Sequence, residues 1–242
     1  MIKVLILIPT YNEAESISNL LNRLQKVRLV VANTYDIDIL IIDDGSPDKT
    51  VEIIKNLDIG KLKILQRNVK SGLGPAYLAG FTEGLKSDYQ YFVEMDADLS
   101  HQPEELPTLL ENAGAHKFVI GTRWMPGGSV VNWPKKRQFI SKMGTRYAAF
   151  ALNLPFRDLT SGYRVIPRSF LEDIDFSKVE TRGYGFQVEM AIKANQNGFA
   201  ITEVPIRFVE RENGHSKMSL AIVWEAWAMV TLWGLQRIYK RR

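Results

Sequence analysis

Short apolar runs alternate with amphipathic stretches along the first half of the chain. The apolar runs have the length of buried strands and are Val4–Ile8, Ile37–Ile42, Leu62–Leu65, Tyr91–Met95 and Phe118–Gly121. The stretches between them have helical character and are Ala14–Val27, Lys49–Asn56, Gly74–Lys86 and Pro103–Asn112. Strands that are apolar on both faces and separated by helices predict an α/β fold, in which a mostly parallel sheet is flanked by helices.

The second half of the chain is less regular. Arg123–Lys136 contains two prolines, two adjacent glycines and two tryptophans, so we expect a long loop there. Asp158–Arg164 is expected to precede a short strand. Tyr184–Gln196 is predicted to be helical and Ile201–Val209 to be extended.

The end of the chain forms a separate segment. Leu220–Leu235 has one charged residue, Glu225, and three tryptophans, and a cluster of Arg and Lys follows it. The run is shorter than the ~20 residues that a membrane span requires. A helix packed on the core and a helix lying in the membrane interface both remain open. We therefore expect one domain over residues 1–219 and a C-terminal amphipathic helix over 220–242, which docks on a membrane surface or a partner.

Composition and charge exclude several kinds of partner and metal site. The net charge of +4 favours anionic partners, but no zinc-finger, RNA-recognition or helix-turn-helix signature accompanies it, so nucleic acid is not an expected partner. The absence of cysteine excludes disulfides and thiolate metal sites, and the three histidines are scattered. The N-terminal apolar run ends at Pro9 without a small-residue cleavage site, so we interpret it as a strand and expect a cytoplasmic protein.

Polar groups follow three of the predicted strands. They are Pro9-Thr10-Tyr11, Asp43-Asp44 and Asp96-Ala97-Asp98. Since ligands bind beyond the carboxyl ends of parallel strands, these groups are expected to face one crevice. Asp96 and Asp98 are hard oxygen ligands that suit Mg²⁺ or Mn²⁺, and such an ion would hold a diphosphate. Each acidic pair could also be an ordinary turn, and spacing alone leaves that alternative open for Asp43-Asp44-Gly45-Ser46.

Other candidate anion sites are weaker. Gly72-Leu73-Gly74 after Lys70 could cradle an anion, but plain entry into a helix is the favoured interpretation. Neither a P-loop nor a dinucleotide fingerprint occurs. Of the cations in the second half, Arg123 is the best phosphate ligand by position, because it ends a buried strand beside Asp96 and Asp98.

Taken together, these motifs resemble family 2 glycosyltransferases of the GT-A fold, and within them the polyprenol monophosphomannose synthases, also called dolichol-phosphate mannose synthases. The motifs that carry the resemblance are IPTYNE (Ile8–Glu13), IIDDGSPD (Ile41–Asp48), GLGPAY (Gly72–Tyr77), MDADLSHQPEELP (Met95–Pro107), GTRWMPGG (Gly121–Gly128), LTSGYR (Leu159–Arg164), GYGFQVEM (Gly183–Met190) and EVPIRFVERENGHSKMS (Glu203–Ser219). The MDADLSH, GTR and FVER segments are the most specific to the mannose-phosphate branch.

The resemblance implies an inverting transfer of mannose from GDP-mannose to a polyprenyl phosphate with a divalent cation, Mg²⁺ or Mn²⁺. By motif, the residues expected to hold the nucleoside are Pro9, Tyr11, Glu13, Ile42 and Asp44. Asp96 and Asp98 are expected to bind the metal, and Ala97 to contact the nucleotide through its backbone. Ser100 stands where some members have a glutamine ligand, and its shorter side chain makes it the weakest expected ligand.

Donor phosphates are expected at Arg123, Arg211 and Lys217, and the acceptor phosphate at Arg137 and Ser141. Asp98 and Arg123 are the expected catalytic residues.

A phosphate acceptor is already mostly dianionic at pH 7, so we expect no protein base. Glu189, in the GFQVEM motif, is interpreted as a helix residue with a local hydrogen bond. The alternatives are a family 2 transferase that uses UDP-glucose or another lipid phosphate, and a catalytically silent nucleotide-sugar-binding subunit. The resemblance also implies a peripheral position on the cytoplasmic face of a membrane, with or without an integral-membrane partner.

Overall fold

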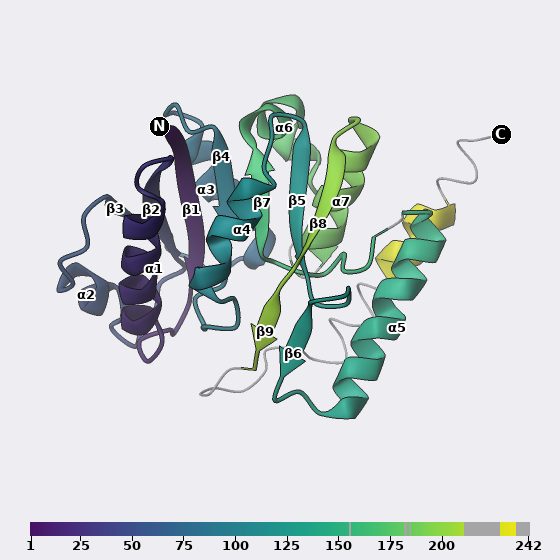
Figure 1. Ribbon diagram of the computed structural model, residues 1–242, viewed down its shortest axis with the longest axis horizontal. Coiled ribbons are helices and arrows are strands. Elements are labelled where there is room, and N and C mark those ends of the chain that lie inside the picture. The colour runs from purple at the N-terminus through teal and green to yellow at the C-terminus, as the bar shows by residue number, and fades with distance from the viewer. Residues whose placement is uncertain (155, 182, 184, 211–227, 236–242) are drawn as a thin grey trace.

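Within the residues that the computed structural model describes, 1–154, 156–181, 183, 185–210 and 228–235, a seven-stranded sheet forms the centre of the molecule (Figure 1). Its order is β3-β2-β1-β4-β7-β5-β8; β7 is antiparallel to both neighbours and all other pairs are parallel. The strands are β1 (Ile2–Thr10), β2 (Tyr35–Asp43), β3 (Leu62–Gln66), β4 (Tyr91–Glu94), β5 (Lys117–Thr122), β7 (Arg164–Pro167) and β8 (Ala200–Pro205). A second, parallel pair consists of β6 (Ser129–Val131) and β9 (Arg207–Val209).

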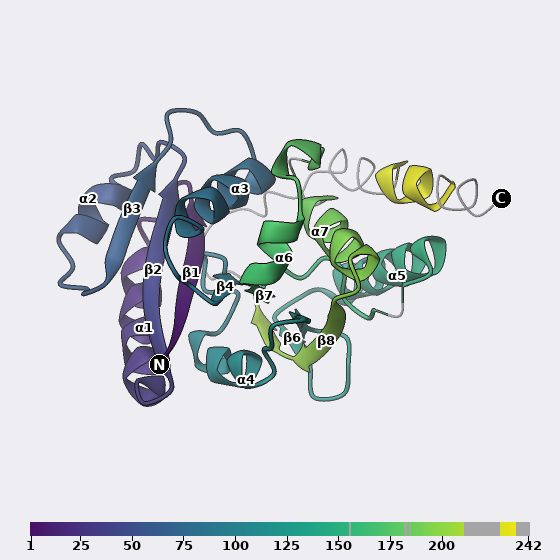
Figure 2. The same cartoon turned by 90° about the horizontal axis from the view of Figure 1, so that it is seen from above.

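Helices cover both faces of the sheet (Figures 1 and 2). They are α1 (Ile17–Val31), α2 (Thr50–Lys55), α3 (Leu73–Gly84), α4 (Leu106–Glu111), α5 (Lys135–Leu152), α6 (Arg168–Asp173) and α7 (Gly185–Gln196), with short 3-10 turns at Pro103–Glu105 and Phe176–Lys178. The α1 and α4 helices pack on one face, and α3, α6 and α7 pack on the other. Two apolar cores result, one on each side of the sheet.

The β1 strand shows why the apolar runs are continuous. Leu5 and Leu7 belong to the core under α3, whereas Val4, Ile6 and Ile8 belong to the core under α1. Successive side chains of a strand point to opposite faces, so a strand covered on both sides needs apolar residues at every position. The expected α/β architecture is confirmed.

One expectation about the second half is wrong. Arg123–Lys136 is not a continuous loop, because it contains β6 and the start of α5 at Lys135. The α5 helix shows no single apolar stripe, since it buries Thr145 and Ala148 but exposes Phe139 and Phe150. A periodicity argument therefore could not find it.

Residues 228–235 are helical and pack against α5. Val230 is buried in the core, and the hydroxyl groups of Tyr147 and Thr231 lie 2.6 Å apart. Gly234 is so close to α5 that an added Cβ would lie 2.9 Å from the carbonyl oxygen of Ala151. This part of the expected C-terminal helix is thus packed on the core; the rest of 220–242 lies outside the described residues. No described helix combines the length and apolar content needed to cross a membrane.

Candidate active site

The three polar strand ends meet at one edge of the sheet. The β1 strand pairs with β2 on one side and with β4 on the other, and the register places Thr10 opposite Asp43. The Asp44 N–H donates to the Thr10 carbonyl oxygen (3.1 Å). This edge is also where the strand order changes direction from β1 to β4, the usual ligand position in an open α/β sheet. The strand ends therefore meet at one edge of the sheet, as predicted.

The two aspartates at the end of β2 have different environments. The Asp43 carboxylate accepts hydrogen bonds from the backbone N–H groups of Gly45 (3.0 Å) and Ser46 (3.1 Å), so it forms the turn. Asp44 instead lies 3.2 Å from the Arg67 guanidinium. Burial raises the pKa of Asp44, and Arg67 opposes that shift. The turn interpretation therefore applies to Asp43, and Asp44 is the member of the pair suited to a ligand.

A tight loop after β4 positions the acidic pair. The Asp98 carboxylate accepts the Ser100 N–H (3.0 Å), and Leu99 adopts a left-handed conformation with a φ of 62°. The Ser100 carbonyl oxygen accepts the Val209 N–H (3.1 Å), which ties the loop to β9. Asp98 is buried, whereas the Asp96 side chain is 32% exposed. The Asp98 carboxylate is thus held by a hydrogen bond within the loop, and the Asp96 carboxylate is partly exposed.

His101 is a buried part of this loop that the sequence analysis missed. Its Nδ1 accepts the Asp96 N–H (3.1 Å), so we assign the proton of the neutral ring to Nε2, which lies 3.8 Å from the Asp96 carboxylate. The ring stacks on Tyr163, with centroids 5.0 Å apart. Burial lowers the pKa of His101, against the opposing charges of Asp96 and Asp98. The neutral imidazole therefore holds the Asp96 backbone through a hydrogen bond and lies beside the Asp96 carboxylate.

The donor set of the loop fits a hard divalent cation. The hydroxyl of Ser100 is buried and has no hydrogen-bond partner in the described part of the chain. Within those residues, no group of three or more His, Asp or Glu side chains has a metal-binding arrangement. The protein thus supplies two carboxylates and a nearby hydroxyl, which suits an ion of the Mg²⁺ type that takes its other ligands from phosphate and water.

A cleft of about 570 Å³ lies between the β1–α1 turn and the acidic loop. Its lining includes Asn12, Glu13, Asp98, Gln102 and Glu210. Of the expected nucleoside residues, Glu13 lines this cleft, whereas Pro9, Tyr11, Ile42 and Asp44 are not among its lining residues. Pro9 is the register partner of Ile42 at the neighbouring strand ends.

At the same end of the sheet the Lys70 ammonium lies 3.8 Å from the centre of the Tyr11 ring. The glycine turn that follows Lys70 has a packing role at Gly74, where an added Cβ would lie 2.6 Å from the Thr181 carbonyl oxygen. Entry into α3 explains Gly74 without an anion.

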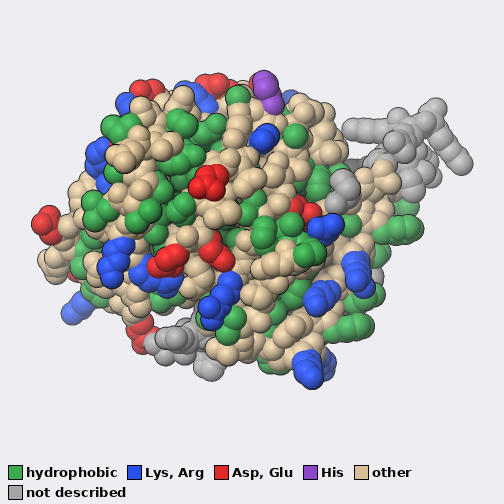
Figure 3. Space-filling model, viewed as in Figure 1, with side chains coloured by type: hydrophobic (Ala, Val, Ile, Leu, Met, Phe, Trp, Pro, Cys, Tyr) green, Lys and Arg blue, Asp and Glu red, His purple; other side chains and the backbone are tan. Residues whose placement is uncertain are grey.

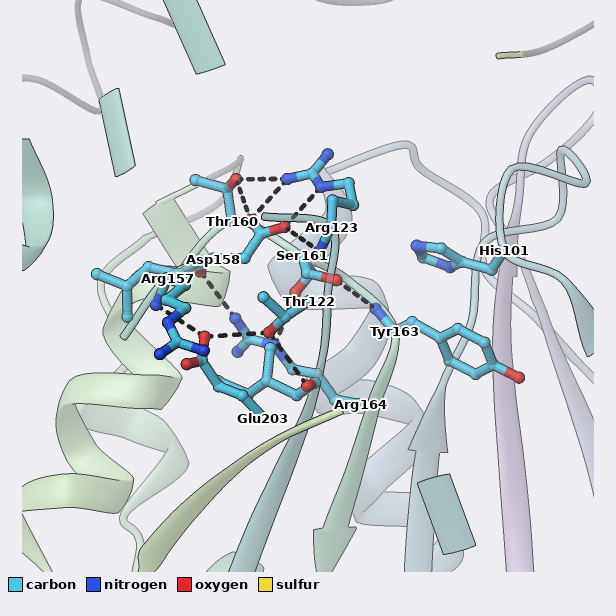
Figure 4. A network of polar contacts seen from close by, with 12 residues as sticks. His101, Thr122, Arg123, Arg157, Asp158, Thr160, Ser161, Tyr163, Arg164 and Glu203 are labelled. Atoms are coloured by element: carbon cyan, nitrogen blue, oxygen red, sulfur yellow. Dashed lines mark hydrogen bonds and ion pairs between the residues drawn. The ribbon is translucent and has the colours of Figure 1, made fainter. Parts of the chain in front are cut away.

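Arg123 is anchored by a buried carboxylate (Figure 4). Its Nε and Nη2 each donate to one oxygen of Asp158 at 2.7 Å, and its backbone N–H also donates to Asp158 (3.0 Å). Thr160 accepts a further hydrogen bond from Nη2 (2.9 Å). Such a bidentate pair sets the orientation of the guanidinium plane. Arg123 is only 7% exposed, so it is not an ordinary solvated surface cation.

One aromatic ring lies between Arg123 and Arg137, a predicted ligand of the acceptor phosphate. The guanidinium carbons of Arg123 and Arg137 lie 5.5 and 4.0 Å from the centre of the Trp133 ring. Arg137 also forms an ion pair with Glu210, and Ser141 follows one helical turn later on α5. The structure thus places Arg123, one expected donor ligand, and Arg137, an expected acceptor ligand, around one indole.

Phe208 joins this basic side of the site to the acidic loop. Its ring centre lies 5.2 Å from the Arg123 guanidinium carbon and 5.6 Å from the ring centre of His101. The basic side and the acidic side are therefore parts of one packed site.

Two buried ionisable residues, Glu94 and Arg164, lie at the end of β4, just before the acidic loop. Glu94 is fully buried, and burial raises its pKa to about 7, although Arg164 and Gln187 favour the charged form. The Arg164 Nε lies 4.0 Å from Glu94 and donates to the Ser161 carbonyl oxygen (2.8 Å). Arg164 therefore links the end of β4 to the segment that precedes β7.

Glu189 has the local role that the sequence analysis favoured. Its carboxylate accepts the Thr181 N–H (3.0 Å) and hydroxyl (2.6 Å), and Lys193 lies 3.4 Å away. These contacts hold the start of α7 to the preceding turn.

Two expected phosphate ligands, Arg211 and Lys217, lie outside the described residues. Three residues that shape the site were missed by sequence reasoning, namely His101, Asp158 and Trp133. His101 and Asp158 lie within or next to recognised motifs, MDADLSH and LTSGYR, which was the available signal. Trp133 offered none, because an indole in an irregular segment is usually only a packing residue.

Comparison with known proteins identifies the family. Residues 5–175 match the model of the family described as "Glycosyl transferase family 2". The undecaprenyl-phosphate mannosyltransferase of Micrococcus luteus is 47% identical, over 96% of this chain and 94% of its own length. The polyprenol monophosphomannose synthase of Mycolicibacterium smegmatis is 44% identical, over 97% of this chain and 88% of its own length.

A solved structure shares the fold. It is glucosyl-3-phosphoglycerate synthase from Mycobacterium tuberculosis in complex with Mn²⁺, UDP and phosphoglyceric acid. The TM-score is 0.71 at 16% identity, and the match covers 96% of this chain and 78% of the other. At that identity the likeness concerns the fold alone. The sequence matches, by contrast, establish that the chain belongs to glycosyltransferase family 2.

Proposed function

We propose that this chain is an inverting mannosyltransferase that moves mannose from GDP-mannose to a polyprenyl phosphate. The observation that carries the proposal is the pairing of a two-carboxylate loop with two arginines gathered at Trp133. The carboxylate loop suits a metal-bound diphosphate, and the two arginines suit a second phosphate. The names of the two sequence relatives, both of which act on polyprenyl phosphates, support the same acceptor.

The donor half of the reaction requires a leaving diphosphate to be stabilised. Asp96 and Asp98 would hold Mg²⁺ or Mn²⁺, which when bound neutralises charge on the departing diphosphate. His101 would help to position Asp96, because its ring accepts a hydrogen bond from the Asp96 backbone N–H. Asp44, buried and beside Arg67, is suited to accept hydrogen bonds from the nucleoside.

The acceptor half of the reaction needs no protein base. A phosphate monoester is mostly dianionic at pH 7, so its oxygen attacks C1 of mannose directly. The new C1–O bond forms on one face while the bond to the GDP oxygen breaks on the other, which inverts the anomeric carbon. Arg123 and Arg137 would screen the repulsion between the two anions.

The test is transfer of label from GDP-mannose into a chloroform-extractable product, with and without polyprenyl phosphate. We expect product only when the acceptor, the donor and a divalent cation are all present. UDP-glucose in a parallel reaction separates the proposal from the nearest alternative within the family. Absence of transfer from every donor, with Mn²⁺ and lipid acceptor present, would instead favour a silent nucleotide-sugar-binding subunit.

A peripheral position at a membrane follows from the acceptor. A polyprenyl chain is anchored in the bilayer, so the enzyme must meet its phosphate at the membrane surface. Transfer by the purified chain alone in the same assay would show that no integral-membrane partner is required.

A further inference from the structure

Three polar side chains converge on Gly162, a partly exposed residue that comes two positions before β7. A Cβ placed on Gly162 would lie 3.5 Å from Cε1 of His101 and 3.7 Å from both Oδ1 of Asp96 and Nε2 of Gln187. These are ordinary contact distances, so an alanine would fit. Gly162 also lacks the positive φ that favours glycine. Neither packing nor backbone conformation requires glycine here. We call the space bounded by the three side chains the Gly162 notch.

The side chain of Gln187, in the first turn of α7, has no partner of its own. Gln187 is 1% exposed, and within the described residues neither its amide nitrogen nor its amide oxygen has a hydrogen-bond partner. Buried amide groups are nearly always hydrogen-bonded, so an unpaired one needs an explanation. Its Nε2 is one of the three atoms at the Gly162 notch. The arrangement indicates a small polar group that the protein itself does not supply.

Arg164 fixes two walls of the Gly162 notch relative to each other. Its side chain is fully buried. The Nε donates to the carbonyl oxygen of Ser161 (2.8 Å), and Nη1 donates to the carbonyl oxygen of Gln187 (2.7 Å). Since Ser161 directly precedes Gly162, one guanidinium group holds both backbone segments. The notch is therefore preorganised rather than dependent on a loose surface side chain.

The polar atoms of the Gly162 notch define the chemistry of its ligand. The Asp96 carboxylate accepts hydrogen bonds, and the Gln187 Nε2 donates them. A hydroxyl group meets both needs, because it donates to one partner and accepts from the other. An anion would be repelled by the carboxylate, and an ammonium group could not accept from the amide. The notch thus suits the hydroxyl group of a neutral ligand, such as a sugar.

The order of the strands places the Gly162 notch in the middle of the site. The acidic loop follows β4, and Arg123 follows β5. The β7 strand lies between β4 and β5 and is antiparallel to both, so its start lies at the edge where they end. Beyond β5, Figure 3 shows Lys and Arg side chains gathered over α5, the helix that carries Arg137. The notch therefore lies between the proposed diphosphate site and the cation proposed for the acceptor, where a transferred sugar must pass.

We propose that the Gly162 notch receives one hydroxyl group of the transferred sugar, so that Gln187 determines sugar specificity. Gln187 donates to the hydroxyl oxygen, and the hydroxyl donates to Asp96. The inference rests on the proposed function and deepens it, because it names the contact through which the site recognises the hexose. A sugar that lacks this hydroxyl, or presents it in the opposite configuration, would leave the buried amide unpaired.

The test compares the affinities of the full chain for GDP and GDP-mannose, measured by titration calorimetry with Mn²⁺ and without acceptor. Gln187→Met keeps the length of the side chain but removes the amide, and Gly162→Ala fills the notch with a methyl group. Each variant should bind GDP-mannose at least about tenfold more weakly than the unaltered chain does. Each should bind GDP within about twofold of the unaltered chain, because GDP has no sugar hydroxyl for the notch.

Deoxy analogues of GDP-mannose, each without one ring hydroxyl, give a second readout. The unaltered chain should bind one of them at least about tenfold more weakly than GDP-mannose. Gln187→Met should bind that analogue and GDP-mannose equally, because the lost hydroxyl and the lost amide are partners.

Matched controls lie away from the notch. Gln196→Met makes the same substitution at an exposed position at the end of α7. Gly60→Ala adds a Cβ with nothing within 4 Å, just before β3 and thus at the opposite edge of the sheet. Both controls should bind GDP and GDP-mannose within about twofold of the unaltered chain.

Two results would overturn the inference: GDP-mannose affinity that is unaltered in Gln187→Met and Gly162→Ala, or equal losses for GDP and GDP-mannose, which would indicate a structural role. Binding of UDP-glucose but not of GDP-mannose by the unaltered chain would contradict only the proposed donor. The same variants would then test the notch with UDP and UDP-glucose. Binding of neither nucleotide sugar would overturn the proposed function and the inference together.

Discussion

The acidic side of the site, Asp96 to His101, is formed by one short loop, whereas the basic side around Arg123 and Arg137 is assembled from distant segments. Asp98 accepts its hydrogen bond from a residue two positions away. Arg123 is held by Asp158, 35 positions away, and Arg137 by Glu210, 73 positions away. Carboxylates at a strand end are positioned by local backbone geometry, but guanidinium groups on long side chains need tertiary partners. The two sides should therefore respond differently to mutation.

Substitutions on the acidic side should lower activity strongly but change stability little. Asp98→Asn removes a charge that the proposed metal requires, and we expect transfer to fall by about 10³-fold or more. The fold should be retained, because the amide oxygen of Asn still accepts the Ser100 N–H. Asp88→Asn, at an exposed ion pair with Lys3, is the matched control and should leave transfer unchanged. Near-native turnover of Asp98→Asn would remove the metal role.

The basic side should lose stability as well as activity. Asp158 is fully buried, so Asp158→Asn leaves the Arg123 guanidinium buried without its counter-charge. We expect a destabilisation of about 3 kcal/mol or more, measured by urea unfolding. The Asp88→Asn variant should show no measurable change. A loss below about 1 kcal/mol for Asp158→Asn would mean that Arg123 does not depend on this anchor.

Glu94, buried next to the acidic loop, should make the free energy of unfolding depend on pH. Burial raises the pKa of Glu94 from 4.5 to about 7, so the folded state favours the protonated acid. Its contribution to stability is fully present below pH 4.5 and is lost as the pH rises through about 7. The loss should approach about 3 kcal/mol between pH 4.5 and 8. Unfolding free energies measured across that range should fall less steeply in Glu94→Gln, and identical slopes would contradict this assignment.

Arg137 should show the smallest effect and the most specific one. Replacing it by Gln keeps most of the packing on Trp133 but removes the charge proposed to bind the acceptor phosphate. We expect the KM for polyprenyl phosphate to rise about tenfold, with little change in the KM for GDP-mannose. Equal increases in the two KM values would indicate that Arg137 contacts the donor instead.

The same contrast explains what the sequence could predict. The strands, their parallel order and the meeting of Thr10, Asp43 and Asp96 followed from apolar runs and from the rules of α/β sheets. His101 escaped because its role depends on a backbone contact and on stacking against Tyr163, 62 positions later. The α5 helix escaped because its apolar residues face both the core and the outside. Residues that end a buried strand or belong to a recognised motif, such as Arg123, were predictable, whereas the side chains that position them, Asp158 and Trp133, were not.

The most direct test of the account is a crystal structure with GDP-mannose and Mn²⁺, using the anomalous signal of manganese. We predict a manganese peak bonded to carboxylate oxygens of Asp96 and Asp98, with the diphosphate on its other side and facing Arg123. A diphosphate bound elsewhere, with both carboxylates facing solvent, would contradict it.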